Sequence, residues 1–217
     1  MPDERQLPTP HGDARVVIRR ARRARLALLL QHGAGGGLQA RDLVALSAAL
    51  PAAGVTTILL QQPFSVAGRR IAPRPAVLDE CLAAVHVRLG LRTPLVLGGR
   101  SAGARSSARM AAPLGAVACL ALAFPLHPPG RPDRSRLPEL ASAGVPTLVV
   151  QGERDPFGTP AEFPPGVPLV VVPDADHAFA VRRSAALSQQ DTLDLLVCAV
   201  RRWLLDEVTA AVAGNGP

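Results

Sequence analysis

The chain contains, from residue 95 to residue 105, the stretch Leu95-Val96-Leu97-Gly98-Gly99-Arg100-Ser101-Ala102-Gly103-Ala104-Arg105. An apolar run leads through Gly-x-Ser-x-Gly into an alanine-rich segment, which is typical of a nucleophile elbow between a strand and a helix. So sharp a turn needs neighbours without bulky side chains, and Gly99 and Gly103 meet that need. Ser101 is therefore a candidate nucleophile. The bare pattern also arises by chance in a Gly- and Ala-rich chain, and Ser101 would then occupy an ordinary turn.

An acid and a histidine follow Ser101 in the chain, each just after a strand-like apolar run. The run 145–150 ends before Asp155, and the run 167–172 ends before His177. Chains with a nucleophile elbow carry their catalytic acid and histidine in this order. We therefore predict Asp155 as the orienting acid and His177 as the base.

Other polar residues compete for these two roles. The alternatives to Asp155 are Glu153, Asp174 and Asp176, but Asp155 is followed by Pro156, which fixes the turn. Asp174 and Asp176 also leave open that the segment around His177 is only a polar turn.

A glycine-rich loop lies upstream, where the apolar run 26–30 enters Gln31-His32-Gly33-Ala34-Gly35-Gly36-Gly37. Such a loop offers backbone N–H groups to an anion, and the residue after a nucleophile offers another. We predict that Ala34 and Ala102 donate to an oxyanion. The glycines would otherwise form a flexible connection, and His32 is interpreted as a residue that shapes the loop through backbone hydrogen bonds.

The chain resembles the α/β-hydrolases, and within them the small, cap-poor branch near dienelactone hydrolase. It is most similar there to the type that includes testis-expressed protein 30 and the hydrolase-like domain of regulatory subunit 3 of the nonspecific lethal chromatin complex. The sequence segments that carry this resemblance lie within residues 26 to 205. They are His32-Gly33-Ala34-Gly35, Gly98 to Arg105, Phe124-Pro125-Leu126-His127-Pro128-Pro129-Gly130, Gln151 to Gly158 and Asp176-His177. The resemblance implies a serine hydrolase with Ser101, Asp155 and His177 as its triad, and it implies no particular substrate.

Three further residues are candidates for substrate binding. Arg100 precedes the serine, and at the pocket mouth it would favour a carboxylate or phosphate. Phe64 follows the second buried strand, where the related type often carries more aromatic residues, and His127 could overhang the pocket. The alternatives are a solvated arginine for Arg100 and an ordered loop residue for His127, and Arg105 is interpreted as structural.

Composition predicts one α/β domain. The 217 residues are 48% hydrophobic, and strand-like runs alternate with helix-like segments, which predicts a mostly parallel sheet with helices on both faces and little or no cap. We expect a loosely ordered segment over 1–14, the domain over 15–213 and a frayed tail over 214–217. Further strands are expected at 55–60 and 116–122 and an edge strand at 15–18; helices are expected at 40–50, 77–89, 137–142 and 192–212, with an irregular loop at 61–75.

Charge and cysteine usage narrow the function classes. The net charge is +7, but every Lys+Arg residue is an arginine and aromatic residues are only 3%, so no specific nucleic-acid binding is expected. The arginines at 19–25 precede too short an apolar run for a signal peptide, and no run is long enough for a membrane span. Three cysteines without metal-ligand spacing, Cys81, Cys119 and Cys198, suit a cytoplasmic protein and are expected in the core.

These observations together predict a cytoplasmic serine hydrolase, a monomer or homodimer without metal or cofactor. It would cleave a small acyl ester, thioester or lactone through an acyl-enzyme. The alternative is a hydrolase-fold protein with weak or no activity that serves as a protein-interaction module.

Overall fold

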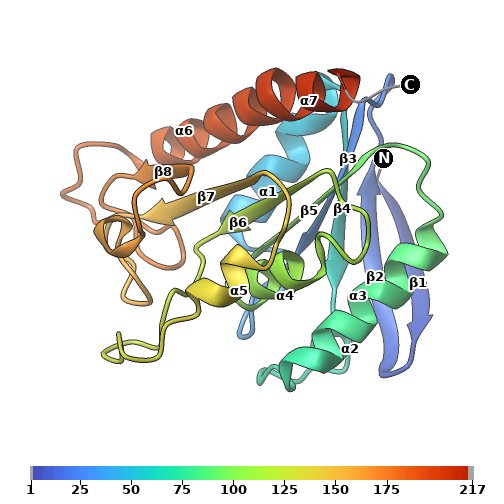
Figure 1. Ribbon diagram of the computed structural model, residues 1–217, viewed down its shortest axis with the longest axis horizontal. Helices are drawn as coiled ribbons and strands as arrows, with labels where there is room; N and C mark the ends of the chain where they lie inside the picture. Colours follow the sequence, from blue (N-terminus) through green and yellow to red (C-terminus); the bar gives the residue numbers. More distant parts are fainter. Residues whose placement is uncertain (1, 215–217) are drawn as a thin grey trace.

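The computed structural model describes residues 2–214, and its centre is one eight-stranded sheet (Figure 1). The strands lie in the order β1-β2-β4-β3-β5-β6-β7-β8. Neighbours from β4 to β8 are parallel, whereas β2 is antiparallel to both β1 and β4. The strands are β1 (Asp3–Thr9), β2 (Gly12–Arg19), β3 (Leu26–Gln31), β4 (Val55–Gln61), β5 (Leu95–Arg100), β6 (Ala118–Leu122), β7 (Thr147–Gly152) and β8 (Leu169–Val172).

Helices cover both faces of the sheet (Figure 1). One layer contains α1 (Arg41–Ala49), α6 (Gln189–Arg202), the π-helical turn η3 (Trp203–Val208) and α7 (Thr209–Gly214). The other contains α3 (Pro75–Leu89), α4 (Ala102–Met110) and α5 (Leu137–Ala141). Short elements complete the chain: η1 (Leu50–Ala53), α2 (Pro63–Val66) and η2 (Pro160–Glu162).

The central strands are apolar because both of their faces are buried. Every residue of β3, and every residue of β6, is buried, which is the reason that the sequence shows continuous apolar runs there rather than alternation. Leu46 of α1 and Trp203 pack into the core on one face, and Leu82 of α3 and Ala108 of α4 pack into the core on the other. The predicted fold class is therefore confirmed.

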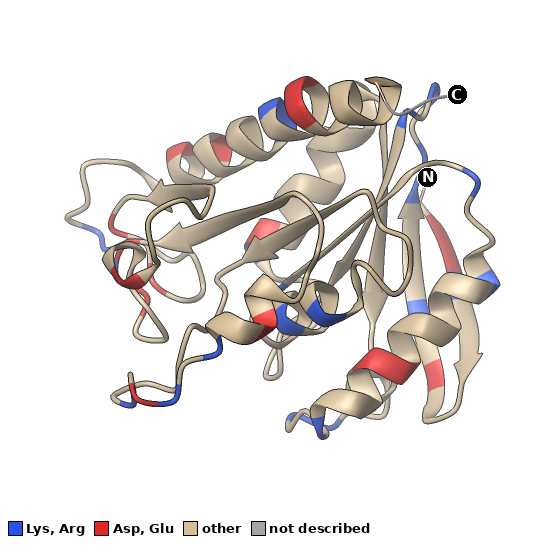
Figure 2. Cartoon of the chain, viewed as in Figure 1, with Lys and Arg blue, Asp and Glu red and all other residues tan. Residues whose placement is uncertain are grey.

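The N-terminal segment corrects the sequence prediction. Residues 1–14 were expected to be loosely ordered, but β1 pairs with β2 from Asp3 opposite Ile18 to Thr9 opposite Gly12. The segment 15–18 is consequently part of an inner strand and not the edge of the sheet. The polar sequence of β1 conceals the strand, because an edge strand with one solvated face needs few apolar residues, and this hairpin carries charges of both signs (Figure 2).

Other local expectations also change. The segment 61–75 contains the helix α2 and is not wholly irregular. Cys81 and Cys119 are buried, but Cys198 is exposed on α6, so its assignment to the core is wrong. The predicted frayed tail lies outside the described residues except for Gly214. None of the helices within residues 2–214 is both long and apolar enough to cross a bilayer.

We expect hydrogen exchange to detect the β1–β2 hairpin. Every second amide of β1 points toward β2 and should exchange at least about 100-fold more slowly than in an unstructured peptide, because opening requires the hairpin to separate. The outward amides should exchange quickly. Mass spectrometry or NMR of the exchanged protein measures both sets, and uniformly fast exchange over residues 3–9 would contradict the pairing.

Candidate active site

Ser101 occupies the turn between β5 and α4 in a conformation that non-glycine residues rarely adopt. Its φ is 54° and its ψ is −113°, and such a backbone persists only where surrounding contacts hold it. The N–H of Ser101 donates to the carbonyl of Leu122 on β6 at 3.0 Å, and its carbonyl accepts from the N–H of Arg105 at 3.1 Å. The sheet and the helix thus fix the turn from both sides.

Close packing explains the two glycines of Gly-x-Ser-x-Gly. A Cβ at Gly99 would lie 2.5 Å from the carbonyl carbon of Gly103, and a Cβ at Gly103 would lie 2.7 Å from the carbonyl oxygens of Gln31 and His32. Real Cβ atoms do not approach backbone so closely. Helix α4 therefore lies against the ends of β3 and β5 at a distance that only glycine permits.

The structure brings Ser101, His177 and Asp155 into one hydrogen-bonded row. His177 Nε2 is 2.9 Å from Ser101 Oγ, and His177 Nδ1 is 2.7 Å from Asp155 Oδ2. Asp155 is fully buried. Its Oδ1 accepts from the N–H of Phe157 at 2.8 Å, and its Oδ2 also accepts from Gln151 Nε2 at 3.0 Å. A carboxylate held in this way can fix both the orientation and the tautomer of the histidine.

The three other acids that were considered for the role of Asp155 bind other groups and not the ring of His177. Glu153 accepts from the N–H of Asp174 at 2.7 Å, and Asp174 pairs with Arg182 and Arg154. Asp176 Oδ1 accepts from the N–H groups of residues 178 and 180 at 2.7 and 2.9 Å, which shapes the turn that carries His177. Asp155 is the acid that reaches the histidine ring.

A cavity of about 480 Å³ opens over Ser101. Its lining comes from the glycine-rich loop, the elbow and the loops that follow β6, β7 and β8, namely Gly33, Ala34, Gly35, Gly36, Arg100, Ser101, Ala102, Arg105, Pro125, Arg136, Phe157 and His177. Ala34 and Ala102 thus flank the same space. Ala102 begins α4, so its N–H has no partner within the helix.

His32 has the structural role that was predicted for it. Its Nδ1 donates to the carbonyl of Gly33 at 2.7 Å, and its Nε2 accepts from the N–H of Gln62 at 3.1 Å. Burial lowers the pKa of His32 below its usual value, which favours the neutral ring that both contacts require. The ring therefore ties the glycine-rich loop to the end of β4.

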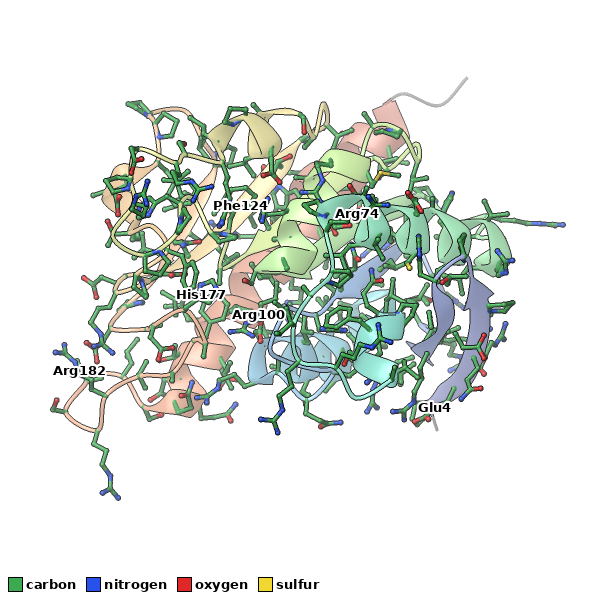
Figure 3. All side chains as sticks on the ribbon, turned by 90° about the horizontal axis from the view of Figure 1, so that it is seen from below. Glu4, Arg74, Arg100, Phe124, His177 and Arg182 are labelled. Atoms are coloured by element: carbon green, nitrogen blue, oxygen red, sulfur yellow. The ribbon has the colours of Figure 1, made fainter. Side chains whose placement is uncertain are left out.

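Arg100 lines the cavity, but its side chain is only 13% exposed and is held by contacts within the protein. Its Nη2 donates to the backbone carbonyl of His177 at 2.7 Å, and Figure 3 shows the two residues side by side. Its Nε lies 3.7 Å from Oδ2 of Asp42, which is fully buried in the first turn of α1. Arg100 therefore connects the elbow, the histidine loop and α1.

Two predicted substrate-binding residues do not line this cavity. Phe64 is buried in α2 and lines a neighbouring cavity of about 410 Å³, where its ring lies 5.5 Å from that of His32. His127 is buried, with Nε2 2.8 Å from Glu162 and Nδ1 2.8 Å from the carbonyl of Pro128. The prediction that these residues contact a substrate therefore lacks support from their positions, whereas Arg105 is bonded to Glu139, as its structural interpretation predicted.

Some residues of the site had no recognised signal in the sequence. Phe157 packs its ring 4.2 Å from the ring of His177, and Gln151 holds Asp155 from the end of β7. Both residues lie in the shared stretch from Gln151 to Gly158, which follows a predicted strand. That position could have indicated that they belong to the site. Asp42 gave none, because an acid at the start of a helix is ordinarily a solvated helix-dipole partner.

Comparison with known proteins assigns the family. A family model described as an alpha/beta hydrolase domain matches residues 24–205. The chain belongs to the alpha/beta hydrolase family. No curated protein sequence matches this chain significantly.

Solved structures share the fold over nearly their whole lengths. XC6422 from Xanthomonas campestris, described as a serine hydrolase without lid, has a TM-score of 0.73 at 22% identity, and the match covers 94% of this chain and 95% of that chain. A dienelactone hydrolase from Anabaena variabilis has a TM-score of 0.70 at 18% identity, covering 94% and 97%. Est1E from Butyrivibrio proteoclasticus has a TM-score of 0.69 at 17% identity, and the match covers 96% of this chain and 99% of that chain. At these identities the likeness establishes the fold alone.

We predict that Gly103→Ala destabilises the protein by about 3 kcal/mol, because the new methyl group has to push strand and helix backbones apart. Gly35→Ala is the matched control from the glycine-rich loop, where a Cβ would meet nothing within 4 Å. Urea unfolding followed by circular dichroism measures both variants. Equal stabilities of the two variants would contradict the packing described for the elbow.

The Arg100–Asp42 pair predicts a pH-dependent cost of removing Arg100. Burial raises the pKa of Asp42, and the Arg100 charge partly offsets that effect. In Arg100→Gln the carboxyl pKa should rise further, so keeping Asp42 ionised costs more in the variant, and this cost falls as the carboxyl takes up a proton at lower pH. The loss of unfolding free energy should be about 3 kcal/mol at pH 8 and smaller at pH 5. A loss that does not change with pH would contradict the ion pair.

Proposed function

We propose that the protein is a serine hydrolase that cleaves a small acyl ester, thioester or lactone through an acyl-enzyme intermediate. The row from Asp155 through His177 to Ser101, with contacts of 2.7 and 2.9 Å, is the observation that supports this function best. Nucleophilic catalysis by a hydroxyl requires an adjacent base that a third group orients. The alternative, a protein-interaction module without activity, has no physical need for that row.

In the proposed reaction Ser101 Oγ attacks the substrate carbonyl carbon while His177 Nε2 takes the hydroxyl proton. Asp155 keeps the imidazole oriented and stabilises its charged form. The protonated His177 then gives its proton to the leaving group as the carbonyl–leaving-group bond breaks, which leaves an ester on Ser101. A water molecule, deprotonated by His177, attacks that ester and releases the acid.

The negative oxygen of each tetrahedral intermediate needs hydrogen-bond donors. We assign this role to the N–H groups of Ala34 and Ala102, which flank the cavity beside Ser101. Each such donor typically contributes about 3 to 4 kcal/mol to stabilisation of the transition state. A Cβ at Gly33 would come within 3.2 Å of Ser101 Cβ, so the loop that carries Ala34 lies directly against the nucleophile.

The finer placement of the protein is also a proposal. The motifs of the sequence favour the small dienelactone-hydrolase-like branch, near the testis-expressed protein 30 type. The fold of the Anabaena variabilis dienelactone hydrolase, at a TM-score of 0.70, is compatible with that placement. We further propose a cytoplasmic enzyme that needs no cofactor and acts on a small molecule.

Replacement of the nucleophile tests the function. Ser101→Ala should lower kcat on 4-nitrophenyl acetate by roughly 10⁴ to 10⁶, while the circular dichroism spectrum stays that of the parent protein. Ser106→Ala is the control, because this serine is buried on the same helix away from the triad contacts. Stopped-assay release of nitrophenolate gives the rates. Retention of most activity in Ser101→Ala would reject the assignment.

A further inference from the structure

The cavity over Ser101 is basic. Among its lining residues the side chains that carry permanent charge are those of Arg100, Arg105 and Arg136, and within residues 2–214 no aspartate or glutamate joins them. The three arginines differ in how far their charges are compensated by acids behind the cavity wall. That difference decides where an anion would bind.

Arg100 and Arg105 already have acidic partners. Arg100 is paired with the buried Asp42. Arg105 donates two hydrogen bonds to Glu139 of α5, at 2.6 and 3.0 Å. Glu139 also pairs with Arg109, so two cations of α4 share this acid of α5.

Of the three cavity arginines, Arg136 is the one that forms no salt bridge with a carboxylate of residues 2–214. It precedes α5, and its position is fixed because its N–H donates to the carbonyl of Leu126 at 2.7 Å. Its Nη1 donates to the carbonyl of Pro125, another cavity residue, at 3.2 Å. A guanidinium has five N–H donors, so most of the donors of this half-buried side chain stay available.

The surroundings of Arg136 disfavour its charge. Burial lowers the pKa of Arg136 from its ordinary value. The positive charges of Arg105 and Arg134 also lower this pKa, and the negative charge of Glu139 offsets only part of the effect. A bound anion would offset these effects, because it supplies a charge of opposite sign and accepts from the free donors.

We propose that Arg136 binds a carboxylate group of the substrate, so that the preferred substrate is a small ester that carries a free carboxylate besides the bond that is cleaved. The inference rests on the proposed function and narrows its substrate class. A planar guanidinium suits a planar carboxylate, since two parallel N–H···O bonds can form. The cavity of about 480 Å³ suits a short substrate that spans from Ser101 to Arg136.

A neutral ester and two esters that carry a free carboxylate on different sides of the scissile bond test the proposal. The neutral reference is 4-nitrophenyl acetate, mono(4-nitrophenyl) succinate carries a carboxylate on the acyl side, and 4-acetoxybenzoate carries one on the leaving group. In Arg136→Gln the ratio of kcat/KM for one anionic ester to that for the neutral ester should fall about tenfold or more. The ester that responds shows on which side of the scissile bond the carboxylate lies.

Arg131→Gln is the matched control, because Arg131 is exposed on the same segment, is outside the cavity lining and is not among the charges that act on Arg136. It should leave both ratios within about twofold of the parent values, since exposed charges act weakly at a distance. Unchanged ratios in Arg136→Gln would overturn the proposal. Equal falls in the two variants would do the same, because they would indicate a general effect of charge and not a site.

A binding measurement separates this inference from the proposed function. Calorimetry with monomethyl succinate and dimethyl succinate on Ser101→Ala needs no turnover. Stronger binding of the monoanion, lost in Arg136→Gln on that background, supports the subsite even if the parent protein cleaves none of the esters and the hydrolase assignment falls. Equal or absent binding of the two compounds would reject the subsite even if 4-nitrophenyl acetate is cleaved.

Discussion

The close approach of α4 to the ends of β3 and β5 is the constraint on which the rest of the site depends. Gly99 and Gly103 permit it, because any side chain at either position would collide with backbone. That approach places Ser101 in a strained turn, leaves the N–H of Ala102 at the start of a helix and puts Gly33 against the nucleophile. One packing contact thus brings the proposed nucleophile and both proposed oxyanion donors together.

Hydrogen bonds connect the elbow and the glycine-rich loop to the other loops of the site. His32 joins the glycine-rich loop to the end of β4, Gln151 holds Asp155, and Arg100 donates to the carbonyl of His177. His32, Gln151 and Asp155 are buried and the side chain of Arg100 is mostly buried, so loss of one partner leaves the other poorly satisfied. We infer that such contacts keep the loops after three different strands in register with one another.

The sequence predicted the parts of the protein whose signal is local. Strands such as β3 are buried on both faces and show as continuous apolar runs, and Ser101, Asp155 and His177 follow strands in a recognisable order. The strand β1 was not predicted, because its solvated face is polar and the segment lacks an apolar run. The partnership of Arg100 with Asp42 was not predicted either, because it joins distant segments, and the same reason applies to the placement of Arg136 beside Arg105.

Fluorophosphonate labelling of the purified protein, followed by peptide mass spectrometry, tests the central claim most directly. These probes react with a serine hydroxyl only when a neighbouring base activates it. The account predicts one labelled peptide modified at Ser101, and no label there after unfolding in urea or in His177→Ala. A folded protein that takes up no label, or that is labelled at another serine, would contradict the assignment of Ser101 as an activated nucleophile.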